Sequence, residues 1–355
     1  MDNREKKPYL LVDSSYVSFH RFFATLIWFV NIYPHVEIED DYDWTQNEVF
    51  MKHFDETYMK NLLKFKNMYN IPNENMIIVR DCPRETIWRM NLYPKYKGTR
   101  KNTCSYKNKK YNVGNVFRHI YQSLYPKLEK QYGFRILKVD NAEADDVIAV
   151  LAKKIREIDP SRLVIIISND NDYLQLVNDK TLIWSLQNRL LNTKVEMTAE
   201  EILLKKILRG DDSDNIPSIV GSMPERMLDD LVTNKENLDK WLIENEKKDV
   251  FEENRKLIDF SYIPEDLKLI IMDKITDNIP EIRDAVKKEE VVQKEVNKGL
   301  LEDFPQHLWK NVDKLKTKVN FFKSVNRYNG YSRNYGYLNY NNYGMQSYVT
   351  EQFYC

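Results

Sequence analysis

The sequence predicts an α/β protein in which a central, mostly parallel sheet is flanked by helices. Four short aliphatic runs, at residues 9–12, 76–79, 135–139 and 163–167, show no regular alternation with polar residues, which is typical of strands buried on both faces. The segments between them are long enough for the helical crossovers that join parallel strands. Each run is followed by acidic residues, so the four strands share one chemical feature at their ends.

The composition is that of a protein with a sizeable core. The 355 residues fit about two domains at roughly 150 residues each. An apolar content of 42% and a mean hydropathy of −0.62 exclude fibrous and membrane classes, so no membrane partner is expected. The apolar stretch 22–33 is too short to span a bilayer and lacks a cleavage site, and we interpret it as a buried helix.

The charge balance and the cysteine content limit the kinds of partner and of cellular compartment that we expect. Basic and acidic residues number 54 each, so an anionic partner has to meet a local basic patch. The three cysteines form neither a disulfide framework nor a zinc motif. This usage predicts an intracellular, reducing compartment and not secretion.

Nine acidic residues follow the predicted strands or open a helical turn. The carboxyl ends of parallel strands meet at one edge of a sheet, where ligands bind, so these carboxylates are expected to converge. They are Asp13, Asp81, Glu143, Asp145, Asp146, Asp170, Asp172, Asp211 and Asp214. Carboxylates this close repel one another unless cations lie among them. Oxygen ligands suit Mg²⁺ or Mn²⁺, and two such ions about 3.5–4 Å apart serve in-line attack at a phosphodiester.

Each acidic motif also has an ordinary structural explanation. The acids at 143–146 open an apolar helix, and those at 170–172 and 211–214 suit caps or turns. Taken singly, the motifs favour these explanations. Their common placement on one side of the inferred sheet favours a metal site.

Residues 84–111 form a basic segment with nine cations and a single acid, Glu85. Aromatic residues are interleaved with the cations, a composition typical of channels that neutralise phosphates and stack bases of single strands. A solvated face or loop is the alternative, and Glu85 with Arg89 could be a simple helical ion pair. Because the segment follows Asp81, it can hold a phosphate against the metal site.

The second half of the chain is predicted to be helical. After a last strand at 183–184 a helical region is expected at 201–323. Within it, residues 244–318 are dense in Lys and Glu, which is typical of solvated helix faces. Residues 324–355 are rich in Tyr and Asn without any period, which predicts a disordered tail. Two interpretations of this tail remain: a terminus without a role, and a segment that recruits replication proteins. The first domain is expected to span 1–200.

The ordered motifs resemble the flap endonuclease, or 5′ nuclease, superfamily, which has a PIN-like core. The resemblance is greatest to the phage ribonuclease H branch and to viral 5′-to-3′ exonucleases. It covers roughly residues 8–270 and rests on the segments 10–15, 88–100, 143–148, 168–176, 210–217 and 254–264.

The resemblance implies roles for individual residues. One metal ion would be held by Asp13, Asp81, Glu143, Asp145 and Asp146, and the second by Asp170, Asp172, Asp211 and Asp214. Residues 84–111 would form a helical arch, in which Arg89 and Lys97 contact the scissile phosphate with Arg100 nearby. Phe19 would take the place of a tyrosine that stacks on a terminal base. The other candidates for nucleic-acid binding are Arg84, Trp88, Lys95, Lys101, Lys107, Lys109 and Lys110.

One segment departs from the family pattern. After Pro217 the family continues with a glycine-rich helical hairpin that grips duplex DNA, but here Met223 replaces a glycine and Glu225 a lysine. We therefore expect a degenerate helix-hairpin-helix segment within 201–323.

The leading hypothesis is a structure-specific 5′ nuclease that uses two Mg²⁺ or Mn²⁺ ions. Its partners would be branched or 5′-ended DNA or an RNA–DNA hybrid, and it would remove flaps or RNA primers in replication or repair. The alternatives are a PIN-like ribonuclease acting on single strands and a non-catalytic scaffold that binds branched DNA. A haloacid-dehalogenase phosphatase is excluded because Ser15 stands where it needs a second aspartate.

Overall fold

The computed structural model describes residues 6–39, 42–99, 103–106, 109–194 and 197–297. The described residues up to 283 form one compact unit, and residues 284–297 belong to a second. The acidic residues of the predicted site all lie in the first unit.

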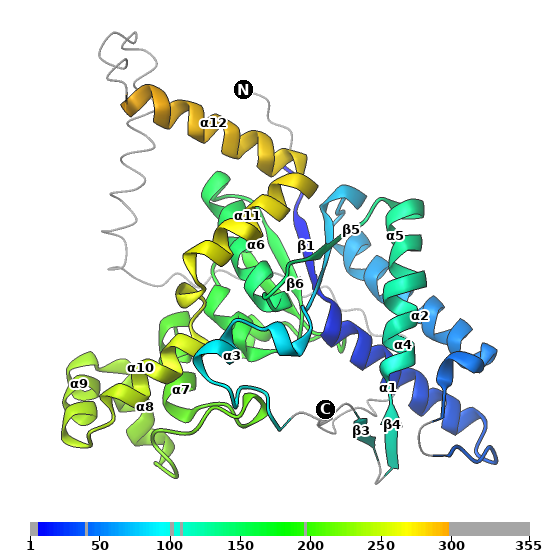
Figure 1. Ribbon diagram of the computed structural model, residues 1–355, viewed down its shortest axis with the longest axis horizontal. Helices are drawn as coiled ribbons and strands as arrows, with labels where there is room; N and C mark the ends of the chain where they lie inside the picture. Colours follow the sequence, from blue (N-terminus) through cyan, green and yellow to red (C-terminus); the bar gives the residue numbers. More distant parts are fainter. Residues whose placement is uncertain (1–5, 40–41, 100–102, 107–108, 195–196, 298–355) are drawn as a thin grey trace. The chain divides into compact units, whose positions relative to one another are not determined.

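The centre of this unit is a parallel sheet of five strands in the order β5-β2-β1-β6-β7 (Figure 1). The strands are β1 (Tyr9–Asp13), β2 (Met76–Arg80), β5 (Arg135–Lys138), β6 (Val164–Ile167) and β7 (Thr181–Trp184). The central strand is β1, in which Leu11 pairs with Ile77 on one side and Ile166 on the other. The first four strands coincide with the four aliphatic runs, so the prediction of a parallel α/β sheet is confirmed.

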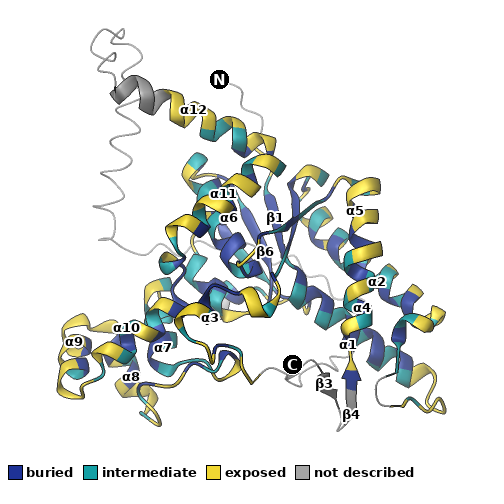
Figure 2. Cartoon of the chain, in the orientation of Figure 1, coloured by how far each residue is buried: buried dark blue, intermediate teal, exposed yellow. Residues whose placement is uncertain are grey.

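Helices cover both faces of the sheet, as Figure 1 shows. On one side lie α1 (Ser14–Ile32), α2 (Glu48–Met68), α4 (Gly114–His119), the π-helical turn η4 (Ile120–Leu124) and α5 (Tyr125–Tyr132). Leu10 and Val12 point into the core beneath these helices. On the other side, α6 (Ala144–Ile158) packs on β1 and β2, and α11 (Glu265–Asn278) packs on α6. The strands are buried and the outer helix faces exposed (Figure 2).

The apolar stretch 22–33 lies almost wholly within α1, where Phe22, Phe23, Leu26 and Phe29 are buried. It belongs to the core, as predicted from its length. Among the helices in the described part of the chain, none combines the length and apolarity needed to cross a bilayer.

The basic segment differs from the helical arch that the resemblance implies. Its first half contains the 3-10 turn η3 (Arg84–Thr86) and the four-residue helix α3 (Arg89–Leu92). Its second half forms an antiparallel hairpin of β3 (Thr103–Tyr106) and β4 (Lys109–Asn112), in which Cys104 pairs with Tyr111. The expected helix is therefore wrong for the described part of this second half.

The region after the sheet is helical, as predicted. It contains α7 (Ala199–Arg209), α8 (Glu225–Thr233), α9 (Lys235–Glu244), α10 (Lys248–Ile258), α11 and α12 (Pro280–Asn297). Short 3-10 turns lie at η1 (Trp44–Gln46), η2 (Asn73–Asn75), η5 (Asn171–Leu176), η6 (Leu191–Lys194), η7 (Asp212–Asp214) and η8 (Phe260–Tyr262). A second apolar cluster joins Leu208 and Leu257 of these helices to Ile87 and Tyr96 of the basic segment. The boundary at residue 200 thus falls inside one compact unit and stays a prediction, as does that at 323.

Candidate metal centre

Three of the predicted acids stand at strand ends. Asp13 ends β1 and caps α1, because its Oδ1 accepts the Tyr16 N–H at 3.1 Å. Its Oδ2 accepts hydrogen bonds from the hydroxyls of Tyr173 at 3.1 Å and Ser168 at 3.3 Å. These bonds fix the Asp13 carboxylate between β1 and the segment that follows β6.

Asp81 and Asp170 occupy the corresponding places on the neighbouring strands. Asp81 follows β2 and accepts the Ala144 N–H at the start of α6 at 2.7 Å. Asp170 follows β6 and accepts the Asp172 N–H at 2.9 Å. Burial, and then the charges of Asp81 and Asp170, raise the pKa of Asp13 to about 7. The three carboxylates are therefore close enough to repel one another.

A tighter cluster lies at the start of α6, where Glu143, Asp145 and Asp146 bring one oxygen each within 4.8 Å of the others. Glu143 and Asp146 also form a capping box, in which Asp146 Oδ2 accepts the Glu143 N–H at 3.0 Å. Burial, and then Asp146 and Glu143, raise the pKa of Asp145 well above its ordinary value. The same residues thus cap the helix and form a carboxylate cluster. We call Glu143, Asp145 and Asp146 the α6 cluster.

Arg89 is the main support of the α6 cluster. Its guanidinium donates to Glu143 at 2.8 Å and to both carboxylate oxygens of Asp146 at 2.8 and 3.0 Å. Its Nε donates to the Leu257 carbonyl at 2.8 Å, and Trp88 Nε1 donates to Asp146 at 2.9 Å. Arg89 is only 2% exposed. Its contact with a scissile phosphate stays a prediction, which this burial does not favour, and the same holds for nucleic-acid binding by Trp88.

A second cluster is formed by Asp172, Asp211 and Asp214, whose oxygens likewise lie within 4.8 Å of one another. We call it the η7 cluster, because Asp211 caps η7 and accepts the N–H groups of Ser213 and Asp214. Lys206 of α7 reaches into it, pairing with Asp172 and lying 2.9 Å from Asp211. Burial acts to raise the pKa of Asp211, but the Lys206 ammonium and these hydrogen bonds lower it to about 2.

Tyr96 and Lys97 of the basic segment join the two clusters. The Tyr96 hydroxyl lies 3.0 Å from Glu143 Oε2 and 3.0 Å from Asp214 Oδ2. Lys97 pairs with Glu143, and its Nζ lies 3.9 Å from Asp214 Oδ2. Asp170 adjoins the η7 cluster through its bond with the Asp172 N–H, and Asp81 adjoins the α6 cluster through its bond with the Ala144 N–H. The charges of Asp81 and Asp170 in turn act on Asp13. We call these nine acids together the acidic ring. The structure thus brings these acids to one edge of the sheet.

The backbone around the ring adopts positive φ at selected residues. Lys97 has φ 52°, and its N–H donates to the Asp214 carbonyl at 2.9 Å. Asn141 and Asn215 adopt φ 65° and 59° beside Glu143 and Asp214. Left-handed backbone at residues other than glycine is concentrated at functional sites, where neighbouring contacts hold it in place.

Gly210 also has positive φ, and here both the backbone conformation and the space around the residue exclude any side chain. Its φ is +69°, and an added Cβ would lie 2.5 Å from the Ile216 and Pro217 carbonyl oxygens. Only glycine fits where the chain turns into Asp211.

The remaining predicted residues are placed as follows. Lys95 is exposed, and Arg84 and Phe19 are half-buried. Lys97 keeps 14% of its side-chain surface. Arg100, Lys101 and Lys107 lie outside the described residues, as do the side chains of Lys109 and Lys110, whose backbone belongs to β4.

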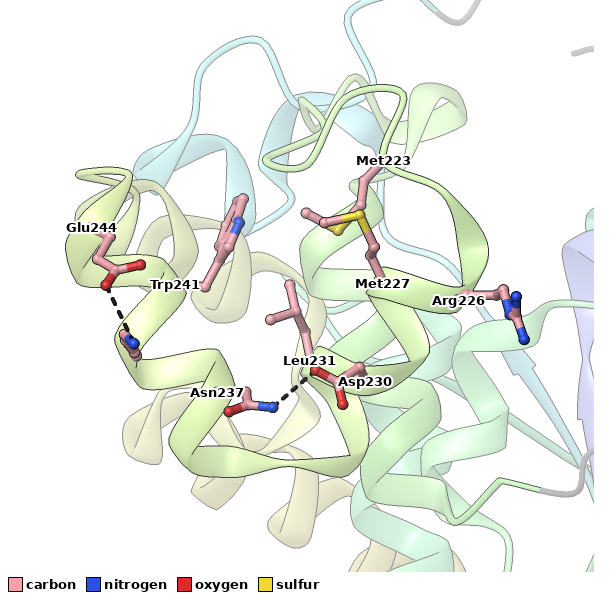
Figure 3. A pocket seen from close by; sticks show the side chains of 9 residues that line it. Met223, Arg226, Met227, Asp230, Leu231, Asn237, Trp241 and Glu244 are labelled. Atoms are coloured by element: carbon pink, nitrogen blue, oxygen red, sulfur yellow. Dashed lines mark hydrogen bonds and ion pairs between the residues drawn. The ribbon is translucent and has the colours of Figure 1, made fainter.

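The segment with the expected degenerate hairpin carries a pocket of 530 Å³ between α8 and α9 (Figure 3). Met223, which replaces the family glycine, lines it together with Met227 and Trp241. Glu225, which replaces the lysine, pairs with Lys205 and Arg209 of α7. A second pocket, of 640 Å³, opens beside the η7 cluster and is lined by residues that include Lys206 and Asp211.

The sequence analysis missed Lys206 and the contacts of Tyr96, an aromatic residue of the basic segment that is only 2% exposed. Lys206 could have been found from its place in the last turn of a helix that leads directly into Gly210 and Asp211. The Tyr96 link gives no local signal, because its partners are 47 and 118 residues away.

The fold and the acidic ring can be compared with known proteins. A family model described as the 5'-3' exonuclease N-terminal resolvase-like domain matches residues 8–207, more than half of the chain. The chain belongs to this 5'-3' exonuclease family. A model described as T4 RNase H, C terminal, matches residues 197–302. Both the superfamily and its phage ribonuclease H branch are therefore confirmed.

Individual members of the 5'-3' exonuclease family resemble the chain at moderate identity. The Ribonuclease H of Enterobacteria phage T4 is 31% identical over 150 residues, which are 37% of this chain and 48% of that protein. A 5'-3' exonuclease of Buchnera aphidicola subsp. Schizaphis graminum is 28% identical over 166 residues, 43% of this chain and 53% of that protein. The chain spans about half the length of these two relatives.

One solved structure, T5 D15 protein co-crystallized with metal ions, has a similar fold. It aligns with a TM-score of 0.51 and 18% identity, and covers 78% of this chain and 99% of that one. At this identity the likeness supports the fold of the exonuclease family and nothing further.

Proposed function

We propose that this protein is a divalent-metal-dependent phosphodiesterase of the 5′ nuclease type, which cuts at or near 5′ ends as a 5′-to-3′ exonuclease or flap endonuclease. The observation that carries the proposal is the gathering of carboxylates at the carboxyl edge of the sheet: two clusters of three, joined by Tyr96, and the three strand-end acids whose charges interact at Asp13. Burying so many like charges is unfavourable without cations among them. Membership of the 5'-3' exonuclease family supports the same activity.

The donors fit hard divalent cations, since every predicted ligand is a carboxylate oxygen. Mg²⁺ or Mn²⁺ would be held by the α6 cluster with Asp13 and Asp81, and a second ion by the η7 cluster with Asp170. When bound, such ions supply Lewis acidity and lower the pKa of water. The two ions and the identity of the metal are part of this proposal.

The protein's own residues would hold the site and place the substrate. Arg89 fixes Asp146 and Glu143 in one orientation, and Tyr173 fixes Asp13. Lys97 is the partly exposed cation between the two clusters, so it can meet a phosphate that approaches them. A substrate phosphate at Lys97 would replace part of its pairing with Glu143 and Asp214.

The partners that we propose are branched or 5′-ended DNA and RNA–DNA hybrids, met during replication or repair in an intracellular, reducing compartment. The nine basic residues of the segment 84–111, which also contains Tyr96 and Lys97, support an anionic partner. Replication proteins would be recruited through residues 324–355, which lie outside the described residues.

The test is cleavage of a labelled 5′-flap duplex by the full chain with Mg²⁺ or Mn²⁺. We expect 5′-phosphorylated products from the wild type, and a loss of at least about 100-fold in rate for Asp170→Asn with DNA binding retained. Asp179→Asn is the matched control, because Asp179 is an exposed aspartate, 74% accessible at its side chain, whose partner is Arg156. No cleavage by the wild type with either metal would refute the proposal. Equal rates on single-stranded RNA would favour the PIN-like ribonuclease instead.

A further inference from the structure

Arg80 is a cation beside the acidic ring that none of the ring's acids engages. It ends β2, directly before Asp81, and it is half-buried. Within the described part of the chain its side chain has no hydrogen-bond or ion-pair partner, and its Nε is buried and unsatisfied. Arg89, by contrast, donates hydrogen bonds to the carboxylates of Glu143 and Asp146 and to the Leu257 carbonyl. A buried donor without a partner calls for an explanation, since leaving it unpaired costs free energy.

The Arg80 guanidinium is held flat by an aromatic ring. Its Cζ lies 3.7 Å from the centroid of Tyr121, which belongs to the π-helical turn η4. Stacking of this kind orients the guanidinium plane while leaving its edge free to donate two parallel hydrogen bonds. π-helical turns occur frequently at functional sites. The Asp81 charge acts on Tyr121 as well, which places this stack next to the acidic edge.

A row of aromatic rings continues from Tyr121 away from the acids. Phe117 lies 5.9 Å from Tyr121 between ring centroids, and Phe19 lies 4.7 Å from Phe117. All three rings are half-buried, so each keeps an accessible part. Phe19 comes from α1, and the other two come from α4 and η4. The row thus begins at Tyr121, on which the Asp81 charge acts, and spans three elements.

We propose that Arg80 and this aromatic row position the single-stranded 5′ arm of the substrate, with Arg80 binding a phosphate next to the acidic ring. The inference rests on the proposed function and extends it to residues outside the basic segment. Aromatic rings with an accompanying guanidinium suit a single strand, because unpaired bases can stack while the cation binds the backbone. Duplex DNA offers phosphates but no free base faces. Arg80 is a positioning residue, distinct from the acids that carry the chemistry.

The alternative is that Arg80 only covers Tyr121 with its aliphatic stem. Binding by the full chain in EDTA separates the two, because no cleavage occurs and the result does not depend on nuclease activity. Two labelled DNAs are compared: a duplex with a single-stranded 5′ arm, and the same duplex with a blunt end. Arg135→Gln is the matched control. Arg135 is the first residue of β5, the strand that pairs with β2, so it lies at the amino end of the strands, whereas Arg80 lies at the carboxyl end.

For Arg80→Gln we expect affinity for the armed duplex to fall about 5-fold and the slope of log K against log[salt] to become shallower by about 0.7, the effect of one phosphate contact on a single strand. Affinity for the blunt duplex and all values for Arg135→Gln should equal those of the wild type. Unchanged binding of the armed duplex, or equal losses on both DNAs, would overturn the inference.

A conservative variant covers the case in which Arg80→Gln does not fold. Arg80→Lys keeps the charge and loses the flat stacked plane, so we expect the wild-type salt slope with about 2- to 3-fold weaker binding of the armed duplex. Wild-type affinity in Arg80→Lys would refute the role of the stacked guanidinium. Loss of cleavage by the wild type with these binding results intact would refute the proposed function but not this inference.

Discussion

The α6 cluster and the η7 cluster use the same side chains in two different ways. In the α6 cluster, Arg89 and a capping box fix Glu143 and Asp146, which are almost wholly buried. In the η7 cluster, Asp211 and Asp214 cap or belong to a three-residue 3-10 turn and Asp172 belongs to η5. The cation that pairs with Asp172 and Asp211 is Lys206, a single lysine of α7. One cluster is held rigid by the fold, while the other leaves room for rearrangement when a cation or substrate binds.

This difference indicates that the two clusters fail in different ways. Removing support from the α6 cluster leaves buried charges unpaired, which affects the stability of the whole unit. Changing the η7 cluster mostly alters local geometry and cation affinity.

The largest effect is expected for Arg89→Met. The variant leaves Glu143 and Asp146 buried without their partner, so the free energy of unfolding should fall by about 3–5 kcal/mol. Urea denaturation measures this loss, with Arg156→Met as the control because Arg156 pairs with an exposed acid. A loss below about 1 kcal/mol, as in the control, would show that the α6 cluster does not depend on Arg89.

Gly210→Ala should break the turn that enters the η7 cluster. The new methyl group would meet two carbonyl oxygens at 2.5 Å, and the backbone has φ +69°. Gly133→Ala is the matched control, since Gly133 has the same φ with nothing within 4 Å of the new atom. We expect about 1 kcal/mol for the control, from backbone strain alone, and at least about 2 kcal/mol more for Gly210→Ala. Equal losses in thermal unfolding would contradict the close packing of this turn.

The sequence is enough to predict that the strand-end acids meet, but it does not show which side chains hold each cluster in place. The strand ends at Asp13 and Asp81 follow from short aliphatic runs, and parallel pairing then brings their carboxylates together. The partners of Arg89 lie 54 and 57 residues away, and such pairs leave no periodic pattern. In the sequence, Arg89 therefore looks like any other cation of the basic segment, and its burial cannot be predicted.

The hairpin in the basic segment was missed for a related reason. Residues 103–112 contain polar, aromatic and charged residues without the alternation that marks a strand. The family resemblance supplied a helix where the sequence itself was ambiguous. Lys206 was missed because lysines on the solvated faces of a Lys- and Glu-rich helix look alike until the helix is packed.

Stability should depend on pH through Asp13, a strand-end acid on which the charges of Asp81 and Asp170 act. The folded state raises its pKa from 3.8 to about 7, so the protonated form is favoured by folding. Its contribution is fully present below pH about 3.8 and is lost as pH rises through about 7, at a cost of a few kcal/mol, because a tenfold change in proton affinity is worth about 1.4 kcal/mol. Thermal unfolding in EDTA should therefore show the loss, and Asp13→Asn should reduce it.

Mg²⁺ should reverse this dependence, because a cation favours the ionised carboxylate. A melting temperature that is independent of pH between 5 and 8 in EDTA, in both the wild type and Asp13→Asn, would contradict this account of the strand-end acids.

The smallest effect on stability is expected for Lys206→Met. Loss of one partly exposed ammonium should cost about 1 kcal/mol, since the Asp211 carboxylate keeps the hydrogen bonds from the N–H groups of Ser213 and Asp214. The same change removes a competing positive charge and should tighten binding of Mn²⁺ about 3- to 10-fold. Lys180→Met is the control, because Lys180 is 41% exposed and lies 4.0 Å from its partner Asp179. Weaker Mn²⁺ binding in Lys206→Met would show that Lys206 supports the cation site.

The central claim is that the two carboxylate clusters bind divalent cations at one edge of the sheet. Titration of the full chain with Mn²⁺, followed by calorimetry, tests it directly. We predict two bound ions for the wild type, one fewer in Asp145→Asn, one fewer in Asp211→Asn, and no change in Asp179→Asn. Absence of Mn²⁺ binding by the wild type at millimolar concentration, or unchanged stoichiometry in both cluster variants, would contradict the claim.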